Sequence, residues 1–509
     1  MTDMLNLKDY IILSLQDNVG LVLSHRISQG SLIQVNNKKI VVKEDIPWGH
    51  KFAIANIEKG NPILKYGQVI GLSKTEILEG EHVHVDKIEY ITEENQFFIE
   101  HKEKSVHEMK NLPDTFLGYK RKNGQVGIRN YIIVLAPVNC SAAVVRKITR
   151  FFEDKSIQHI DGVVPITYGG GCAQSFNSKN HHTLVRTIAG WIENPNVVAC
   201  LLVGLGCETV NIESILENIR TNDEKIISHF NIQDVGGTQK SIQLGIEKVQ
   251  HIINHLSILE RTEVPVEHLV LGLNCGGSDI FSGITANPAL GVASDVLVAK
   301  NGTVVFAETP ECNGAEAYMK SRCLNEDDKN KLDDIINWWE HYTAFNNVKL
   351  NDNLSKGNMA GGISTILEKS LGAISKAGIS PICKVLHYAE QIKQRGLLFM
   401  DTPGFDPVSV TGLVAGGCNL IAFTTGRGSV LSTAIAPTVK ISTNTELFTK
   451  LTDDIDLDTG CIMQGEKLED VGIEIYKTLI DIASGKPTKG ELCKMGTDEF
   501  VPWQFGEIL

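Results

Sequence analysis

The strongest constraint on the fold is the alternation of short apolar runs with helix-length amphipathic stretches from Gly118 onward. The run 130–138 (NYIIVLAPV) is followed by the stretch 141–153, where Val145 and Ile148 lie at helical spacing. The same kinds of segment recur at 161–167, 182–193, 196–205, 209–219, 267–273, 284–300, 302–308, 395–401, 419–425 and 436–443. This alternation predicts parallel β-sheets with helices on both faces, which is an α/β fold.

The first 90 residues have a different pattern, with short β-rich runs bounded by turn glycines. They indicate a small, mostly β domain, and the polar, charged stretch after them is typical of a linker. The charged stretch 323–353 is interpreted as a solvated helix that joins two α/β lobes. The expected segments are 1–90 (β-rich domain), 91–117 (linker), 118–350 (α/β catalytic lobe) and 351–509 (second α/β lobe).

Charge and cysteine content exclude several classes of protein. The 61 acidic and 48 basic residues give a net charge of −13, which argues against a nucleic-acid or anionic-membrane partner. No apolar run is long enough to span a membrane, and the N-terminus lacks the features of a signal peptide. The 11 cysteines are an odd number spread over a long chain, so we expect free thiols and a cytoplasmic location.

Reactive side chains fall where the predicted strands end, often in glycine-rich turns: Cys140, Cys172, Cys207, Cys275, Glu308, Asp401 and Arg427. Ligands of open α/β sheets bind beyond the carboxyl ends of the strands, so these seven positions predict one polar site at one edge of one sheet. The cysteine spacings match no compact metal motif. The four thiols are therefore buried packing residues, soft ligands for iron or an iron–sulfur cluster, or polarised thiols at helix N-termini.

The segment 274–291 (NCGGSDIFSGITANPALG) carries a concentration of small polar residues. Asp279 lies in a glycine-rich turn, and further polar side chains follow or precede it: Ser278, Ser282, Thr285 and Asn287. This pattern is typical of a capped helix N-terminus or of a cradle for an anion or a polyol. Glu308 is interpreted as a metal ligand, a general base or a solvated loop carboxylate.

Two further patterns suit ligand binding. Arg427 lies between two glycines, and a guanidinium group there fits bidentate capture of a substrate carboxylate. His50, His82 and His84 all fall in the small N-terminal domain. His82 and His84 are two residues apart, so on a strand they project to the same face, which suits metal ligation as well as a solvated pair.

The common catalytic and nucleotide-binding templates are missing from the sequence. The stretch 204–209 (GLGCET) has two glycines of the dinucleotide fingerprint but lacks the third. No P-loop, H-E-x-x-H, C-x-x-C or G-x-S-x-G motif is present. The sequence therefore does not support a nicotinamide, nucleoside-triphosphate or serine-hydrolase enzyme.

Taken together, several longer motifs resemble the altronate/galactarate dehydratase family. They are GYKRKNGQVGIRNY, VNCS, GLGCE, CGGSDIFSGITANPALG, ETPE, GNMAGG with LEKSLG, and FTTGRGS. The similarity runs from about residue 118 to 480, and the part with GHKFA and KYGQVIG resembles the SAF-type module of these enzymes.

The resemblance implies a hydro-lyase that converts a sugar acid, altronate first and galactarate next, into a 2-keto-3-deoxy acid by metal-assisted β-elimination. It implies Fe²⁺ with Mn²⁺ as a substitute, and an iron–sulfur cluster as the alternative. The implied catalytic residues are His50, Lys51, Asp279 and Glu308. The implied metal ligands are Cys140, Cys172, Cys207, Cys275, His82 and His84. The implied substrate-binding residues are Ser278, Ser282, Thr285, Asn287 and Arg427. We expect a small-molecule substrate and a homo-oligomer.

Two alternatives remain open. A sulfo-lyase acting on sulfolactate belongs to the same broader family, but those enzymes are usually built from separate subunits. A non-catalytic sugar-acid binding protein would bind ligand without forming product.

The chain departs from the family pattern at two places. It has Asn353-Leu354-Ser355-Lys356-Gly357-Asn358-Met359 where the family usually has N-P-S-P-G-N-K, and YGGGC where close members have shorter turns. If the first loop contacts substrate, specificity differs. The histidines of EHVH are missing from galactarate-type members and point to the altronate-like branch.

Overall fold

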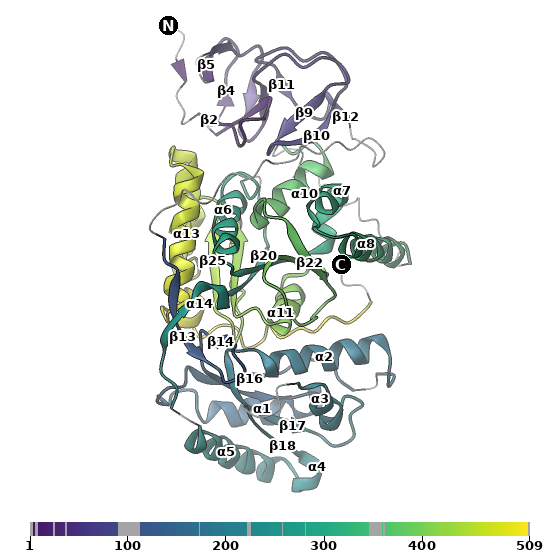
Figure 1. Ribbon diagram of the computed structural model, residues 1–509, viewed down its shortest axis with the longest axis vertical. Helices are drawn as coiled ribbons and strands as arrows, with labels where there is room; N and C mark the ends of the chain where they lie inside the picture. The colour runs from purple at the N-terminus through teal and green to yellow at the C-terminus, as the bar shows by residue number, and fades with distance from the viewer. Residues whose placement is uncertain are drawn as a thin grey trace.

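The computed structural model describes residues 4–5, 9–23, 26–35, 38–89, 112–172, 174–220, 225–256, 258–279, 281–345, 359 and 362–506. Three regions follow one another along the long axis of the molecule (Figure 1). The N-terminal β domain lies at one end, a seven-stranded sheet with its helices lies in the middle, and a four-stranded sheet lies at the other end (Figure 1).

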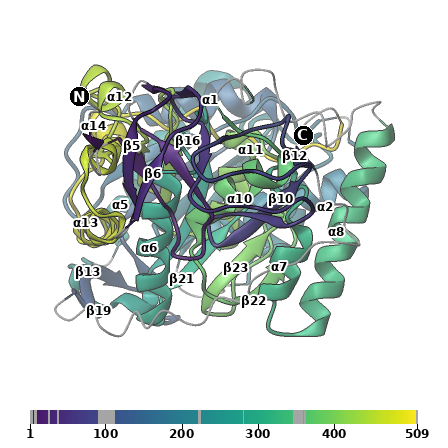
Figure 2. The same ribbon diagram turned by 90° about the horizontal axis from the view of Figure 1, so that it is seen from above.

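The N-terminal domain is built from short, mostly antiparallel strands, which confirms the β-rich prediction. Its strands are β1 (Met4–Leu5), β2 (Tyr10–Ile11), β3 (Val19–Val22), β4 (Arg26–Ile27), β5 (Leu32–Val35), β6 (Lys38–Val41), β7 (Ile46–Pro47), β8 (Lys51–Ala53), β9 (Pro62–Lys65), β10 (Gln68–Ser73), β11 (His82–Val83) and β12 (Ile88–Glu89). One sheet has the order β11-β8-β3-β2. Figure 2 views this domain from above, in front of the helices of the middle region.

The four-stranded sheet is parallel, with the order β16-β15-β17-β18. Its elements are β15 (Tyr131–Leu135), α1 (Asn139–Arg150), β16 (Gly162–Ile166), α2 (Lys179–Glu193), β17 (Val197–Gly204), α3 (Ile212–Asn218), β18 (Ile226–Asn231), α4 (Ile232–Val235) and α5 (Thr238–His255). Successive side chains of a strand point to opposite faces. Ile132 and Val134 therefore join the core beneath α1 and α5, whereas Ile133 and Leu135 join the core that contains α2.

The seven-stranded sheet is also parallel, with the order β22-β23-β21-β20-β24-β25-β26. Its region contains β20 (Val270–Cys275), α6 (Ala286–Ala299), β21 (Thr303–Phe306), α7 (Glu316–Arg322), α8 (Glu326–Phe345), α10 (Ile366–Ile374), a 3₁₀ turn η6 (Ser375–Ala377), β22 (Ile382–Leu386), β23 (Gly396–Met400), α11 (Asp406–Gly416), β24 (Leu420–Thr425), β25 (Thr438–Ser442), α12 (Thr445–Lys450), β26 (Leu457–Asp458), α13 (Leu468–Ala483) and α14 (Lys489–Leu492). Helices α6 and α11 lie on opposite sides of the sheet (Figure 1).

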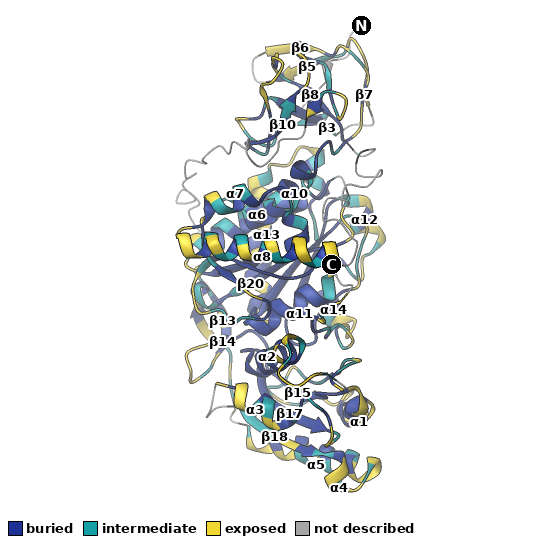
Figure 3. Ribbon diagram, turned by 90° about the vertical axis from the view of Figure 1, so that its right-hand side faces the viewer, coloured by how far each residue is buried: buried dark blue, intermediate teal, exposed yellow. Residues whose placement is uncertain are grey.

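The sheets divide the α/β region at a different place from the expected boundary near residue 350. Strands β20 and β21 precede residue 350 and strands β22 to β26 follow it, yet all seven belong to one sheet. Helix α8 is also more than a solvated connection, because Trp339 is buried and the helix packs on β22. One face of α8 remains exposed (Figure 3). Most of the expected linker, residues 90–111, lies outside the described residues.

Among the contacts that hold the four-stranded sheet to the seven-stranded one are a small sheet and a pair of helices. A short antiparallel sheet joins β13 (Thr115–Lys120), β14 (Val126–Gly127) and β19 (Thr262–Pro265). Helix α2 also packs closely on α11, because a Cβ atom at Gly190 would lie 2.2 Å from the Ala415 carbonyl oxygen. Trp191 donates its indole N–H to the Thr411 carbonyl at 3.0 Å. None of the helices in the described parts has the length and apolarity needed to cross a membrane.

Candidate active site

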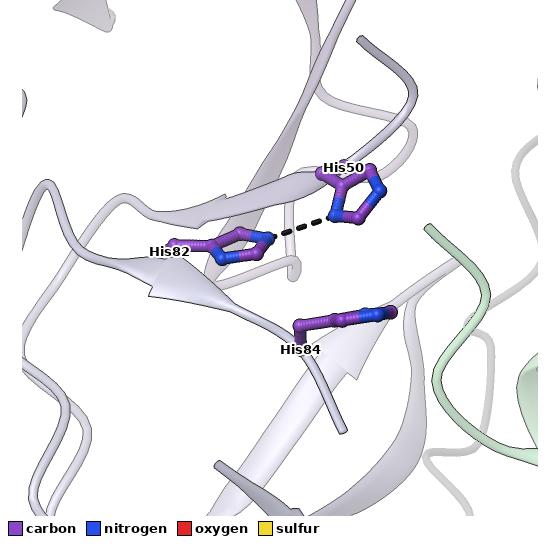
Figure 4. Close-up of side chains that lie close together, drawn as sticks. All are labelled: His50, His82 and His84. Atoms are coloured by element: carbon purple, nitrogen blue, oxygen red, sulfur yellow. Dashed lines mark hydrogen bonds between the residues drawn. The ribbon is translucent and has the colours of Figure 1, made fainter. Parts of the chain in front are cut away.

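Three histidines of the N-terminal domain form a cluster (Figure 4). Strand β11 pairs with β8, which brings His82 beside the turn that holds His50, and His84 follows two residues later. The Nδ1 atom of His50 and the Nε2 atom of His82 are 2.8 Å apart. Each of the three rings offers a nitrogen, and these nitrogens all lie within 4.8 Å of one another. The structure thus brings together the three histidines that the sequence singled out.

The surroundings of the cluster favour neutral imidazole rings. Burial first, and then the neighbouring histidines, lower the pKa of His82 to about 4. The pKa of His84 is also lowered to about 4, by burial first and then by His50 and Lys51. A neutral imidazole can offer a nitrogen lone pair to a metal, whereas a protonated one cannot.

A buried carboxylate joins the N-terminal domain to the middle region. Glu368 on α10 accepts hydrogen bonds from Lys51 Nζ at 2.9 and 3.0 Å and from Lys65 Nζ at 2.6 Å. Lys51 also donates to the Gly362 carbonyl oxygen at 2.6 Å. Next to this ion triad, Ser364 Oγ lies 3.4 Å from His84 Nδ1. The segment 362–368 therefore packs against the histidine cluster.

The charges of this triad are mutually dependent. Burial alone would raise the pKa of Glu368, but the ammonium groups of Lys51 and Lys65 outweigh it and lower the pKa to about 2. Burial lowers the pKa of Lys51 to about 8, although Glu368 opposes the shift. Because Lys51 Nζ is fully buried and bound to Glu368 and Gly362, the structure gives it a place in the domain junction rather than at an open surface.

The β9–β10 turn of the N-terminal domain also enters the middle region. A Cβ atom at Gly283 would lie 2.6 Å from the Tyr66 hydroxyl, and one at Gly372 would lie 3.1 Å from it. Larger residues at these two positions would displace the ring. The turn thus lies between the start of α6 and α10.

A second cluster lies at the carboxyl edge of the seven-stranded sheet. Cys275 ends β20, and its Sγ atom lies 3.1 Å from Glu311 Oε2 and 2.9 Å from Lys376 Nζ. Lys376 also forms an ion pair with Glu308, which is completely buried. The backbone N–H of Cys275 donates to Glu308 Oε2 at 3.1 Å. Cys275, Glu308 and Glu311 offer three ligand atoms within 4.8 Å of one another.

This second cluster has more acidic groups than bases. Burial raises the pKa of Glu308 to about 8, because Glu311 and Asp406 add to the effect and together they outweigh Lys376. Burial first, and then Glu311, raise the pKa of Asp406 to about 6. The pKa of Lys376 is raised well above its ordinary value, because the acidic groups around it outweigh its burial. The cluster therefore retains protons on acidic groups near neutral pH.

Asn274 connects Glu308 to Asp406. Its Nδ2 atom donates to Glu308 Oε1 and to Asp406 Oδ1, both at 3.0 Å. Its Oδ1 atom is buried and has no hydrogen-bond partner among the described residues. An unpaired buried carbonyl oxygen costs free energy, so it marks a place where a polar ligand would be accommodated.

The segment after Cys275 is a braced turn. Asp279 Oδ1 accepts from the backbone N–H groups of Phe281 and Ser282, and Oδ2 accepts from Thr443 and Asn444. Three of the predicted polar residues, Ser282, Thr285 and Asn287, have protein partners as well. Asn287 uses both ends of its amide, donating to Gly372 and accepting from Thr424. These contacts fix the turn.

Ser278 and Arg427 are the exposed members of this neighbourhood. The Cβ atom of Arg427 lies 3.5 Å from the position that a Cβ atom at Gly277 would take. On the other side of the turn, a Cβ atom at Gly276 would lie 2.2 Å from Asp406 Oδ2. Asp406 and Arg427 therefore flank one turn at the same sheet edge.

The other three predicted cysteines do not belong to this edge. Cys140, Cys172 and Cys207 follow β15, β16 and β17, which form the four-stranded sheet, and all three are exposed. The expectation of one site at one sheet edge is therefore wrong. The sequence correctly placed each of these cysteines after a strand, but its pattern does not reveal which sheet that strand joins.

The sequence reasoning missed the charged residues that hold the two clusters together: Lys65, Glu368 and Lys376. Glu368 lies in a helix whose other residues are mostly apolar, and a buried charge in such a helix is the signal that could have identified it. The loop 353–358, in which the chain departs from the family pattern, lies outside the described residues.

Three family profiles cover almost the whole chain. Residues 266–508 match the C-terminal domain of D-galactarate/altronate dehydratase, and residues 118–257 match the second domain of D-galactarate dehydratase/altronate hydrolase. Residues 8–90 match the altronate/galactarate dehydratase SAF domain. The change of profile between 257 and 266 coincides with the change from the four-stranded to the seven-stranded sheet.

Curated relatives agree with these matches. The chain is 35% identical over 483 residues to altronate dehydratase of Bacillus subtilis, covering 94% of this chain and 96% of the relative. It is 31% identical over 488 residues to galactarate dehydratase (L-threo-forming) of Escherichia coli, covering 94% and 93%. It is 32% identical over 396 residues to the β subunit of (2R)-sulfolactate sulfo-lyase of Chromohalobacter salexigens, covering 76% and 96%.

The fold and these matches define an enzyme of the hydro-lyase class. The chain belongs to the altronate/galactarate dehydratase family.

Proposed function

We propose that the protein dehydrates a sugar acid, with altronate as its substrate and galactarate as the next candidate, to give a 2-keto-3-deoxy acid. One observation carries the proposal: the part of the chain that contains α10 contacts both the histidine cluster and the cluster around Cys275. The histidine cluster faces residues 362–368 at the start of α10, while Lys376, in the turn η6 directly after α10, contacts Cys275 and Glu308. The similarity to the altronate dehydratase of Bacillus subtilis supports the choice of substrate.

The histidine cluster fits a divalent metal, and we assign Fe²⁺ to it, with Mn²⁺ as a substitute. Imidazole nitrogens suit iron, and His50, His82 and His84 present three such nitrogens within 4.8 Å of one another. A divalent ion bound there supplies Lewis-acid polarisation of the carboxylate and 2-hydroxyl of the substrate. This set keeps His82 and His84 from the metal ligands expected from the sequence and adds His50 to them.

The cluster around Cys275 is suited to moving protons. Elimination needs a base that removes the C2 proton and an acid that protonates the departing C3 hydroxyl group. Glu311 and Asp406 are half-buried and so can be reached by a substrate, whereas Glu308 is enclosed behind them. We assign the proton transfers to Glu311 and Asp406, with Lys376 holding Glu308 in place.

Arg427 is placed to bind a substrate carboxylate. It is exposed, and within the described parts of the chain no hydrogen bond or ion pair engages its guanidinium group. A guanidinium can hold both oxygens of a carboxylate with two parallel hydrogen bonds. We therefore assign substrate orientation to Arg427, beside the braced turn that Asp279 fixes.

A substrate panel tests the proposal. The full chain is supplied anaerobically with ferrous iron and with each of a set of aldonic and aldaric acids, and keto-acid formation is measured. Altronate should give the largest kcat/KM and galactarate the next. Sulfite release from sulfolactate without keto acid from any sugar acid would replace the proposal by a sulfo-lyase. Binding of altronate without product would replace it by a binding protein.

A further inference from the structure

The exposed thiols of the four-stranded sheet gather at a single edge. Cys140, Cys172 and Cys207 follow β15, β16 and β17, and these three strands are neighbours in the order β16-β15-β17. Five other cysteines of the chain are buried, as thiols commonly are. Three exposed thiols at the carboxyl ends of adjacent parallel strands therefore need an explanation other than packing.

A backbone contact holds the turn of Cys172 against that of Cys140. The N–H of Asn139 donates to the Gly170 carbonyl oxygen at 2.9 Å. Gly171 has a φ of +89°, and a Cβ atom there would lie 2.2 Å from the Pro137 carbonyl oxygen. Only glycine allows this approach. Cys140 lies one residue after this contact and Cys172 lies two residues after it.

The turn of Cys207 is equally well defined. Leu135, the last residue of β15, pairs with Leu202 of β17, and Cys140 and Cys207 each lie five residues after their member of this pair. The buried carboxylate of Glu208 accepts from the N–H groups of Leu205, Gly206 and Cys207 at 2.7–3.0 Å. These three bonds fix the turn, while the Cys207 side chain remains exposed.

One of the three cysteines lies at the start of a helix. Cys140 is the second residue of α1, a helix of 12 residues whose N-cap, Val138, provides no side-chain hydrogen bond. The N–H groups of the first turn of this helix therefore lie beside Cys140. Thiolates are the ligands that iron–sulfur clusters require.

We propose that Cys140, Cys172 and Cys207 bind an iron–sulfur cluster through three thiolates, leaving one iron without a protein ligand. Neighbouring strands are about 4.8 Å apart, so thiols after three adjacent strands spread over more than the reach of one ion. Consistently, the three sulfur atoms are not all within 4.8 Å of one another, as the histidine nitrogens are. The proposal is independent of the proposed function, because these thiols belong to a different sheet from Cys275.

Acid-labile sulfide gives a test that does not depend on activity. The full chain and its variants are reconstituted anaerobically with a mixture of ferrous and ferric iron and with sulfide, desalted, and analysed for iron, labile sulfide and visible absorption. The unmodified chain should retain about four sulfides per chain and absorb near 400 nm. Cys140→Ser, Cys172→Ser and Cys207→Ser should each lose most of the sulfide and the absorption. Cys493→Ser, which replaces another exposed cysteine, should retain both.

A second comparison separates this site from the histidine site. His82→Ala should keep the labile sulfide while losing the iron that is not accompanied by sulfide. Thermal unfolding checks that the serine variants fold, which is expected because the three side chains are exposed. Sulfide retention in any of the three serine variants, iron binding by the thiols without sulfide, or a disulfide between two of them in the reconstituted chain would overturn the proposal.

Discussion

The two parallel sheets of the protein present their carboxyl edges very differently. At the seven-stranded sheet, Cys275 is buried against Lys376 and two glutamates, and the N-terminal domain lies over the neighbouring helix α10. At the four-stranded sheet, Cys140, Cys172 and Cys207 are exposed. The comparison teaches that a cysteine after a parallel strand has no fixed chemistry, because burial and neighbouring charges decide it.

The pKa of the Cys275 thiol shows the effect of burial directly. Burial raises this pKa well above its ordinary value, Glu308 and Glu311 raise it further, and Lys376 only partly opposes them. The Cys275 thiol is therefore protonated, and it belongs to a cluster whose acidic groups retain protons near neutral pH. At the edge of the four-stranded sheet the three thiols are exposed among the residues that the structure describes, which leaves them accessible to an external ligand.

The largest effect is expected at Lys376. Lys376→Met leaves Glu308 buried without its ammonium partner, so the free energy of unfolding should fall by about 3–5 kcal/mol. The kcat should fall at least about 100-fold, because proton transfer depends on the same cluster. Chemical denaturation and initial rates, at a temperature where the variant is folded, measure the two effects.

The matched control is Lys329→Met, which removes an exposed lysine from an ion pair with Glu326. Its free energy of unfolding should change by at most about 1 kcal/mol. If Lys376→Met were as stable and as active as this control, the buried cluster would have no special role.

A smaller effect is expected at the domain junction. Glu368→Gln removes the carboxylate that binds Lys51 and Lys65, so the free energy of unfolding should fall by about 3 kcal/mol. Displacement of the histidine cluster should lower kcat/KM by up to about 100-fold. The control is Glu326→Gln, which replaces an exposed carboxylate. Equal losses of stability and of kcat/KM in the two variants would contradict the role assigned to Glu368 at the junction.

The pH dependence of the junction has a defined sign. The pKa of Glu368 is about 2 in the folded protein, against an ordinary value of 4.5. A lowered carboxyl pKa contributes stability above pH 4.5 that is lost as the pH falls towards 2. The difference in unfolding free energy between the unmodified chain and Glu368→Gln should thus shrink as the pH falls from 4.5 towards 2. A difference that grows on acidification would refute this assignment.

The smallest effect is expected at Arg427. Arg427→Ala should raise KM for altronate by roughly 10- to 100-fold, because charged hydrogen bonds to a carboxylate contribute about 1.5–3 kcal/mol. Stability should not change, since the side chain is exposed. Arg150→Ala, another exposed arginine, is the control for general loss of positive charge. A KM unchanged from that control would remove Arg427 from the substrate site.

Much of the fold could be predicted from the sequence. The apolar runs predicted parallel strands with helices between them because residues such as Ile132 and Ile133 must be buried on both faces of a sheet. The boundary near 350 could not be placed, since periodicity identifies strands but gives no information on their spatial order. Helix α8 was misjudged because its many charged residues concealed the buried Trp339, which donates to Asp401.

The candidate site could be predicted only in part. His82 and His84 were singled out because a two-residue spacing on a strand fixes a shared face. The two residues do lie in one cluster, but β11 ends at Val83, so His84 reaches the cluster from the bend after the strand. Glu368 and Lys376 were missed because their partners, Lys51 and Cys275, are 317 and 101 residues away in sequence. Such long-range ion pairs leave no local pattern.

The central claim is that the histidine cluster and the edge around Cys275 act as one site across the domain junction. The most direct test is anaerobic iron binding and altronate dehydration by His82→Ala, with His341→Ala, an exposed histidine, as the control. The account predicts that His82→Ala loses both the sulfide-free iron and keto-acid formation while the control keeps both. Full dehydration activity in His82→Ala would contradict it.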